Sequence, residues 1–188
     1  VVSDPKVIDI AFDKYKTAQW VESLGLTAPK TYVRLEDCKK ALAAGEIDFP
    51  LFMKPRWGSG SIGLESIADM EELDIYYGLL MKKIKKTILA TASVGDEYIM
   101  IQEKLTGSEF GLDIMNDLDG KNIGVSVKQK LAMRAGETDK AVTVDLPEVR
   151  EMGRKIGEVL GHIGNLDVDI MQRADGAYCV LELNPRFG

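Results

Sequence analysis

Three short segments of the chain carry the side chains that could do chemistry, and the first of them suits phosphate groups. Lys54 ends an apolar stretch and is followed by a loop rich in glycine and serine, Gly58-Ser59-Gly60-Ser61-Ile62-Gly63. Glycines let backbone N–H groups turn toward one point, serine hydroxyls add donors, and the lysine supplies a positive charge. The spacing is that of neither a P-loop nor a dinucleotide-binding fingerprint. A surface hairpin with an incidental lysine is the alternative explanation.

The second segment lies at the end of the chain and suits a hard metal ion. On a strand, Glu182 and Asn184 point to the same face. Asp167 and Asp169 do the same on a preceding strand, which a short turn makes the hairpin partner. Carboxylate and amide oxygens suit Mg²⁺, and several carboxylates on one sheet face repel one another unless a cation is present. Arg186 follows and is well shaped for phosphoryl oxygens. The alternative is a polar face open to water.

The third segment, residues 102–109, is a strand that runs into a short connector. Such a connector can present backbone groups to the edge of an adenine, and Glu109 can accept hydrogen bonds from ribose hydroxyls. Taken alone, the segment is better explained as a solvated loop with ordinary charges.

Basic residues lie between the connector and the end of the chain. We hypothesise that Lys128, Lys130 or Arg134 reaches a substrate carboxylate or a γ-phosphate. The alternative is an exposed strand with basic residues on its wet face. His162, the single histidine, is predicted to lie at a helix end near the last carbonyl groups and not to act as a catalyst.

The elements that must position these residues are mixed in type. Capping residues and glycine stops predict helices over residues 13–24, 36–45, 69–86 and 145–160. Apolar runs and turn residues predict strands over 31–33, 50–54, 98–102, 111–115, 123–130, 166–171 and 178–183. Helices together with antiparallel hairpins indicate an α+β fold and not a regular βαβ array.

The composition narrows the class of partner. The chain has 188 residues, a formal net charge of -6 and two cysteines. The negative charge disfavours general affinity for nucleic acid or anionic membranes, and two cysteines make no disulfide framework. No apolar run approaches the roughly 18 residues of a membrane span, and no leader peptide is visible. We therefore expect a cytoplasmic protein, in which a local cluster of Lys and Arg could still bind a small anionic ligand.

Taken in order, these motifs resemble the ATP-grasp superfamily, and within it the large subunit of carbamoyl-phosphate synthase. The resemblance covers nearly the whole chain and is carried by Asp13-Lys14, Gly25–Pro29, Lys54-Pro55, Glu103-x-Leu-x-Gly-x-Glu109 and Glu182-x-Asn-Pro-Arg186. It implies two α+β lobes whose antiparallel sheets grip ATP between them. We expect residues 1–102 to form the N-terminal part with the glycine-rich loop, and residues 103–188 the C-terminal lobe with the hinge and the metal site.

The resemblance also implies a role for each matching residue. Groups that contact the phosphates would be Lys14, Lys54 and the loop residues Gly58, Ser59, Gly60, Ser61 and Gly63. Adenine would meet Glu103 and the backbone of Leu105, and ribose would meet Glu109. Mg²⁺ or Mn²⁺ would be held by Asp167, Glu182 and Asn184, although the family more often has Gln or Glu at the first position, so Asp169 stays open as an alternative to Asp167. Arg186 would steady the transferred phosphoryl group.

The implied activity is that of an ATP-dependent ligase. A carboxylate attacks the γ-phosphate, and an amine then displaces phosphate from the acyl phosphate. Family members carry further domains on both sides of this core, so we expect this chain to be part of a longer protein. Whether that protein forms homo-oligomers through those domains is left open. The alternatives are a non-catalytic ATP-binding sensor or scaffold, a kinase that stops at the acyl phosphate, and a fragment of a true carbamoyl-phosphate synthase.

Overall fold

The computed structural model describes the chain except for residues 1–2, 59–62, 88–95, 135–136 and 187–188. The chain forms two compact units, a larger unit of Val1–Ala28 with Thr106–Gly188 and a smaller unit of Pro29–Leu105. The chain therefore passes between the units twice, whereas the sequence led us to expect residues 1–102 in one part. The difference arises because the two N-terminal helices pack on the last strand of the chain.

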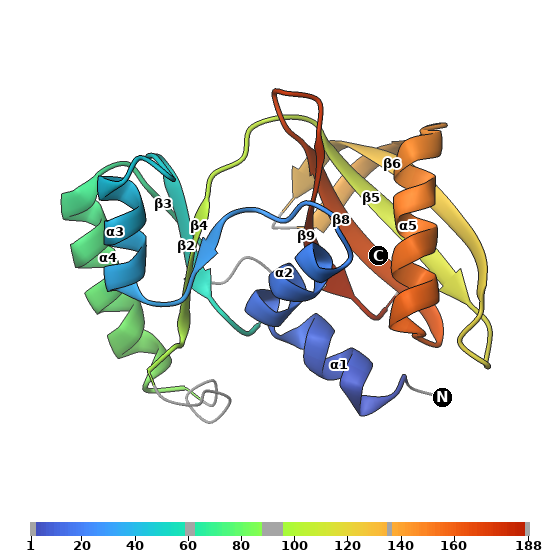
Figure 1. Cartoon of the computed structure of the whole chain (residues 1–188), viewed down its shortest axis with the longest axis horizontal. Coiled ribbons are helices and arrows are strands. Elements are labelled where there is room, and N and C mark those ends of the chain that lie inside the picture. Colours follow the sequence, from blue (N-terminus) through green and yellow to red (C-terminus); the bar gives the residue numbers. More distant parts are fainter. Residues whose placement is uncertain (1–2, 59–62, 88–95, 135–136, 187–188) are drawn as a thin grey trace. The chain divides into compact units, whose positions relative to one another are not determined.

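The smaller unit is a four-stranded antiparallel sheet with two helices (Figure 1). The strand order is β1 (Thr31–Tyr32), β4 (Ile99–Glu103), β2 (Leu51–Pro55) and β3 (Glu65–Ile67). The helices are α3 (Leu35–Ala43) and α4 (Met70–Ile84). Asp69 caps α4 as predicted by accepting from the Glu72 N–H, while the Glu72 carboxylate accepts from the N–H of Ala68 and not from that of Asp69. Side chains of Leu51, Met53 and Ile101 lie fully buried in its core.

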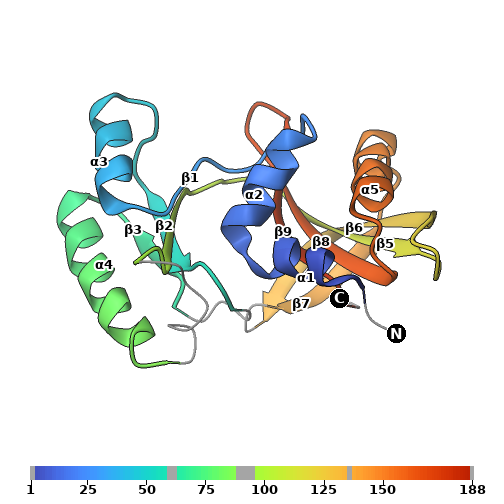
Figure 2. The same ribbon diagram turned by 60° about the horizontal axis from the view of Figure 1, so that its bottom comes forward.

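The larger unit is a five-stranded antiparallel sheet with three helices. The strand order is β7 (Glu137–Thr143), β6 (Asn122–Arg134), β5 (Glu109–Asn116), β8 (Gly164–Gln172) and β9 (Tyr178–Asn184). Helices α1 (Pro5–Phe12) and α2 (Lys14–Ser23) lie beside β9 in both views (Figures 1 and 2).

Helix α5 (Pro147–Leu160) covers the apolar face of this sheet. It begins with a proline in its first turn and ends at Gly161, whose left-handed conformation closes the helix. The contact is close, because a Cβ atom at Gly153 would lie 2.7 Å from side-chain atoms of Leu112 and Val125. With α5 on this face, the residues that alternate with Leu112 along β5 point to the opposite face.

The observed class is the predicted one, α+β with two antiparallel sheets. The predicted helices and strands are present with bounds shifted by a few residues at most, while α1, β3 and β7 were not predicted. Within the described residues, no helix combines the length and apolar character needed to cross a bilayer.

Candidate functional site

The face of the larger sheet opposite α5 brings together most of the charged residues that the sequence singled out. The predicted hairpin of β8 and β9 is present, and its register sets Asp167 opposite Asn184 and Asp169 opposite Glu182. Residues that are directly opposite in an antiparallel pair point to the same face. All four side chains therefore belong to one polar surface, as their alternation along the two strands predicted.

Lys130 of β6 reaches across this face and bridges two carboxylates. Its Nζ lies 2.7 Å from Glu109 Oε1 and 2.6 Å from Asp169 Oδ1, and its side chain is only 5% exposed. Burial by itself lowers the pKa of Lys130, but the attraction of Asp169 and Glu109 outweighs it and raises the pKa above its ordinary value. Lys130 is thus a fixed positive charge within the sheet face.

Lys128 makes a second bridge two residues earlier on the same strand. Its Nζ lies 3.1 Å from Asp113 Oδ2 and 3.7 Å from Asp167 Oδ1. Burial raises the pKa of Asp167, the Asp169 carboxylate raises it further, and Lys128 acts in the opposite direction. Gly111 leaves the space for this lysine, because a Cβ atom there would lie 2.7 Å from Lys128 Cε.

Lys14 joins the same cluster from α2. Asp13 caps the helix by accepting hydrogen bonds from the backbone of Tyr15 and Lys16. Lys14, the first helical residue, extends to β9, and its Nζ lies 3.1 Å from Glu182 Oε1. The Asp-Lys pair near the start of the chain and the Glu-x-Asn pair near its end are thus neighbours in space.

The cluster carries a net negative charge, and its carboxylate oxygens are of the type that ligates a hard metal ion. We define it as the lysine–carboxylate cluster, with members Lys14, Lys128, Lys130, Glu109, Asp113, Asp167, Asp169 and Glu182. Three ammonium groups against five carboxylates leave a formal charge of −2, which one divalent cation balances. Donor type and charge therefore fit Mg²⁺.

The carboxylates are at present arranged around lysines. Among the residues that the structure describes, no three His, Cys, Asp or Glu side chains are grouped as a metal site by themselves. The expected ligand set of Asp167, Glu182 and Asn184 contains an amide and stays a prediction. The register does not separate Asp167 from Asp169, since one lies opposite Asn184 and the other opposite Glu182.

Asn165 and Asp113 lie on this polar face but were not singled out from the sequence. Asn165 Nδ2 donates to Asp113 Oδ1 and to the backbone carbonyl of Arg186, at 3.1 Å each. The side chain of Arg186 is exposed. Arg134, in contrast, is exposed at the far end of β6 after two register shifts, and the structure does not bring it into the cluster.

In the smaller unit, Lys54 and the start of the glycine-rich loop are described. Lys54 lies on β2 opposite Met100. Gly58 and Gly63 have φ angles of 115° and 73°, which side-chain-bearing residues rarely adopt. Ser59, Gly60 and Ser61 lie outside the described residues.

The residues before the loop are held by a charged group. Trp57 is buried and has the Arg56 guanidinium 4.8 Å from its ring centroid, and Arg56 pairs with Glu97 at 3.1 Å. The loop thus starts from a fixed position on the smaller unit.

The expected adenine residues lie where the chain leaves the smaller unit. Glu103 ends β4, its Oε1 accepts a hydrogen bond from the Lys30 backbone N–H at 2.8 Å, and its own N–H donates to the Lys30 carbonyl at 3.0 Å. Leu105 is the last residue of the unit. The two chain crossings, at Ala28–Pro29 and Leu105–Thr106, are therefore tied together on the smaller-unit side.

His162 is a structural residue. It is fully buried after α5, and its Nε2 donates to the carbonyl of Ile114 at 3.0 Å, while its Nδ1 lies 3.4 Å from the amide of Asn116. The predicted position at a helix end is confirmed, although the ring hydrogen bond goes to β5. Burial lowers the pKa of His162.

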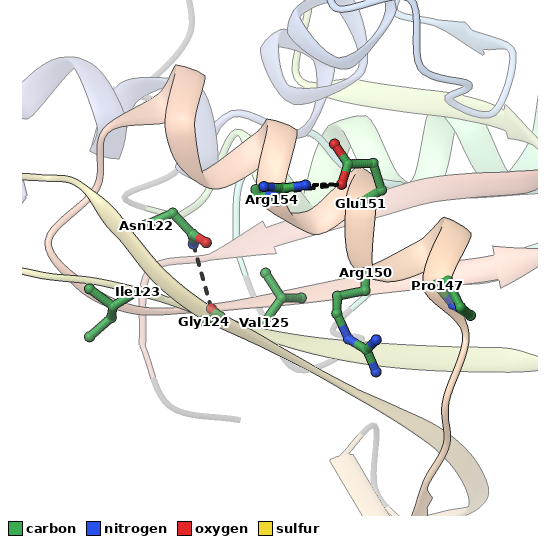
Figure 3. A pocket seen from close by; sticks show the side chains of 8 residues that line it. All are labelled: Asn122, Ile123, Gly124, Val125, Pro147, Arg150, Glu151 and Arg154. Atoms are coloured by element: carbon green, nitrogen blue, oxygen red, sulfur yellow. Dashed lines mark hydrogen bonds and ion pairs between the residues drawn. The ribbon is translucent and has the colours of Figure 1, made fainter.

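A groove of about 530 Å³ lies between α5 and β6 (Figure 3). Its arginines are already paired, Arg150 with Asp145 at 2.7 Å and Arg154 with Glu151 at 2.5 Å. Because Val125 lines it and faces α5, the groove is on the opposite side of the sheet from the lysine–carboxylate cluster.

Comparison with known proteins identifies relatives over nearly the whole chain. The D-alanine–D-alanine ligase of Stutzerimonas stutzeri is 27% identical over 185 residues, which cover 93% of this chain and 55% of that protein. The carbamoyl phosphate synthase large chain of Pseudomonas putida is 23% identical over 194 residues, which cover 98% of this chain and 17% of that protein. The chain thus spans about half the length of the first relative.

Solved structures agree on the fold. The biotin carboxylase domain of Hydrogenobacter thermophilus 2-oxoglutarate carboxylase, solved with MgADP, ADP and bicarbonate, has a TM-score of 0.82 and 18% identity, covering 100% of this chain and 42% of that one. The sequence profile described as the ATP-grasp domain matches residues 11–188. The chain therefore belongs to the ATP-grasp family.

Proposed function

We propose that this chain is the ATP- and Mg²⁺-dependent core of a ligase that activates a carboxylate as an acyl phosphate for attack by an amine. The observation that carries the proposal is the lysine–carboxylate cluster of the larger unit. Its formal charge of −2, made of five carboxylates and three lysines, suits a divalent cation, and its lysines suit the phosphate oxygens that accompany one.

Under this proposal, each unit supplies its own set of residues that contact the nucleotide. Lys54 and the Gly58–Gly63 loop bind phosphates, and Glu103 with the backbone of Leu105 binds adenine; these belong to the smaller unit. Lys14 binds phosphate, Glu109 binds ribose, and Arg186 steadies the moving phosphoryl group; these belong to the larger unit. Mg²⁺, held by Glu182 and Asn184 with Asp167 or Asp169, would neutralise charge on the phosphate oxygens.

The reaction needs no nucleophilic side chain. An oxygen of the substrate carboxylate attacks the γ-phosphorus, the bond to the β–γ bridging oxygen breaks, and ADP leaves. The amine then attacks the carbonyl carbon, phosphate leaves, and a proton is lost from nitrogen. The protein's residues position the reactants and offset charge, as in other phosphoryl transfers. Lys128 and Lys130 are the cations of this face that the proposal assigns to the substrate carboxylate or the γ-phosphate, and Arg134 is the less favoured candidate because it is exposed beyond them.

The relatives divide over the substrate. A D-alanine–D-alanine ligase and a carbamoyl phosphate synthase match the chain with similar identity, so the carbamoyl-phosphate-synthase-like assignment is one of several that the similarity supports. Carbamoyl-phosphate synthesis starts from bicarbonate, whereas the other reaction joins two amino acids. We propose a small carboxylate and a small amine, and take these two pairs as the first to test.

The experiment is an ADP-release assay with Mg·ATP and a panel of carboxylate and amine pairs that begins with D-alanine and with bicarbonate plus ammonia. We expect ADP release that depends on a carboxylate, and a hydroxamate when hydroxylamine replaces the amine. Tight binding of Mg·ATP without turnover of any pair would contradict the proposal and favour an ATP-binding sensor. Accumulation of the acyl phosphate with no amine use would favour a kinase.

A further inference from the structure

Asn165 occupies a position on the polar face that no motif predicted. It lies on β8 two residues before Asp167 and is only 6% exposed. Its Nδ2 donates one hydrogen bond to Asp113 Oδ1 and one to the carbonyl oxygen of Arg186, both at 3.1 Å. Both hydrogens of the amide group are therefore used, and they connect strand β5 to the segment that follows β9.

Asp113 is itself held in place by the lysine–carboxylate cluster. One of its oxygens accepts from Asn165 and the other pairs with Lys128 Nζ at 3.1 Å. A continuous chain of contacts thus runs from Lys128 on β6 through Asp113 on β5 and Asn165 on β8 to the backbone of Arg186. Its two ends are residues to which the proposed function gives roles at the substrate and the phosphoryl group.

The Asn165 hydrogen bond holds the Arg186 carbonyl at a point where the pairing of β8 with β9 has already ended. Pairing between β8 and β9 stops at Asp167 and Asn184, and the next residue, Pro185, has no N–H to donate. The Arg186 N–H donates back to the Asn184 carbonyl at 2.7 Å. The Asn165 amide therefore attaches the backbone to the sheet two residues beyond the last ladder pair.

We propose that Asn165 is a positioning residue that fixes the backbone from which the Arg186 side chain projects, and so determines where its guanidinium meets the transferred phosphoryl group. The inference rests on the proposed function for the role of Arg186. An aspartate at position 165 has no hydrogen to donate and sets a carboxylate against Asp113. A leucine has the same size and makes neither bond.

The kinetic test is a double-mutant cycle of Asn165→Leu and Arg186→Ala. A small displacement of a catalytic group costs up to about 100-fold in rate, so we expect Asn165→Leu to lower kcat by about 10- to 100-fold and to change the KM for ATP by less than about 3-fold. In the Arg186→Ala background the same substitution should lower kcat by no more than about 2-fold, since coupled residues are not additive.

A second measurement tests the anchor, which is the Asn165 hydrogen bond to the Arg186 carbonyl, and does not depend on enzyme activity. The Arg186 amide should exchange with solvent several-fold faster in Asn165→Leu than in the wild type, as measured by hydrogen exchange. Asn122→Leu is the control, because Asn122 also donates its Nδ2 hydrogens, to the Met115 carbonyl and Asn116 Oδ1, but has no link to Arg186. It should leave the Arg186 exchange rate unchanged.

The outcomes separate the two proposals. A wild type without turnover defeats the proposed function, and the exchange data still judge the anchor. Unchanged Arg186 exchange in Asn165→Leu overturns the anchor. Faster exchange with fully independent effects of the two substitutions on kcat overturns the positioning role. If Asn165→Leu does not fold, Asn165→Ser replaces it in both experiments, because its shorter side chain cannot span both acceptors.

Discussion

Glu182 lies where the start and the end of the chain meet, opposite Asp169 and 3.1 Å from Lys14 Nζ. Substitution Glu182→Gln keeps the shape of the side chain and an oxygen for Lys14, but it removes the negative charge that a metal ion requires. We expect ATP turnover to fall by at least about 100-fold. Because the ion pair is partly exposed, the unfolding free energy should change by less than about 1 kcal/mol.

The matched control for this prediction is Glu158→Gln on the exposed face of α5. Steady-state ADP release and thermal melting of both variants give the comparison. Wild-type turnover in Glu182→Gln would remove Glu182 from the metal site, and loss of folding would make its role structural.

Because His162 is buried, we predict that its contribution to stability depends on pH. Burial lowers the pKa of the folded protein's His162 below the ordinary 6.5, so the unfolded chain takes up the proton first as the pH falls. The contribution of neutral His162 to the free energy of unfolding is fully present above about pH 6.5. It is lost as the pH falls below that value. The stability difference between the wild type and His162→Gln should therefore shrink between pH 7 and pH 5.

Urea unfolding at a series of pH values measures this difference. Carboxylates such as Asp167, whose pKa is raised, are present in both proteins, so their contributions cancel in the comparison. A difference that stays constant over this pH range would show that His162 does not titrate with folding.

At the scale of elements, the glycines of two helices should respond to alanine in opposite ways. At Gly78 in α4 a Cβ atom would meet nothing within 4 Å, whereas at Gly153 in α5 it would lie 2.7 Å from Leu112 and Val125. Gly78→Ala should stabilise by about 0.5–1 kcal/mol through helix propensity. Gly153→Ala should destabilise by about 1–3 kcal/mol through overpacking. Chemical denaturation of the two variants checks the sign, and stabilisation by both would contradict the close packing of α5.

Local signals predicted the elements where they were strong. Pro147 in the first turn indicated α5, and Asp13 indicated the start of α2. The expected cap at Asp145 was wrong, because Leu146 is the N-cap residue and makes no side-chain cap hydrogen bond. Strand β3 is three residues long, and β7 is a mostly polar edge strand paired only with β6, so neither shows a clear pattern. Helix α1 was missed although Asp4 and Pro5 carry both a cap and a first-turn proline.

The site was predictable only in part, because alternation sets the face of a side chain but not its partner. Alternation predicted that Glu182 and Asn184 share one face of the sheet. It also predicted that Asp167, on the neighbouring strand, points to that same face. Which residues meet across strands depends on register, and the β8–β9 ladder shifts after Asp169. Asp113 could therefore not be matched to Lys128 from the sequence, nor Asn165 to Arg186.

At the scale of the whole molecule, the two units divide the proposed nucleotide contacts between them. Each has its own sheet and its own hydrophobic cluster, and the chain passes between them twice. The N-terminal helices belong with the C-terminal strands because α1 and α2 pack on β9, which the order of motifs along the chain did not reveal. Our central proposal is that Lys54 contacts the phosphates of ATP and that Glu182 and Asn184 bind its metal ion.

A crystal structure of the protein with Mg²⁺ and a non-hydrolysable ATP analogue tests this central claim most directly. We expect Lys54 to contact the phosphates of the bound nucleotide, and Glu182 and Asn184 to bind the metal ion. A nucleotide with its phosphates remote from Glu182 and Asn184, or a metal ion held by other residues, would contradict it.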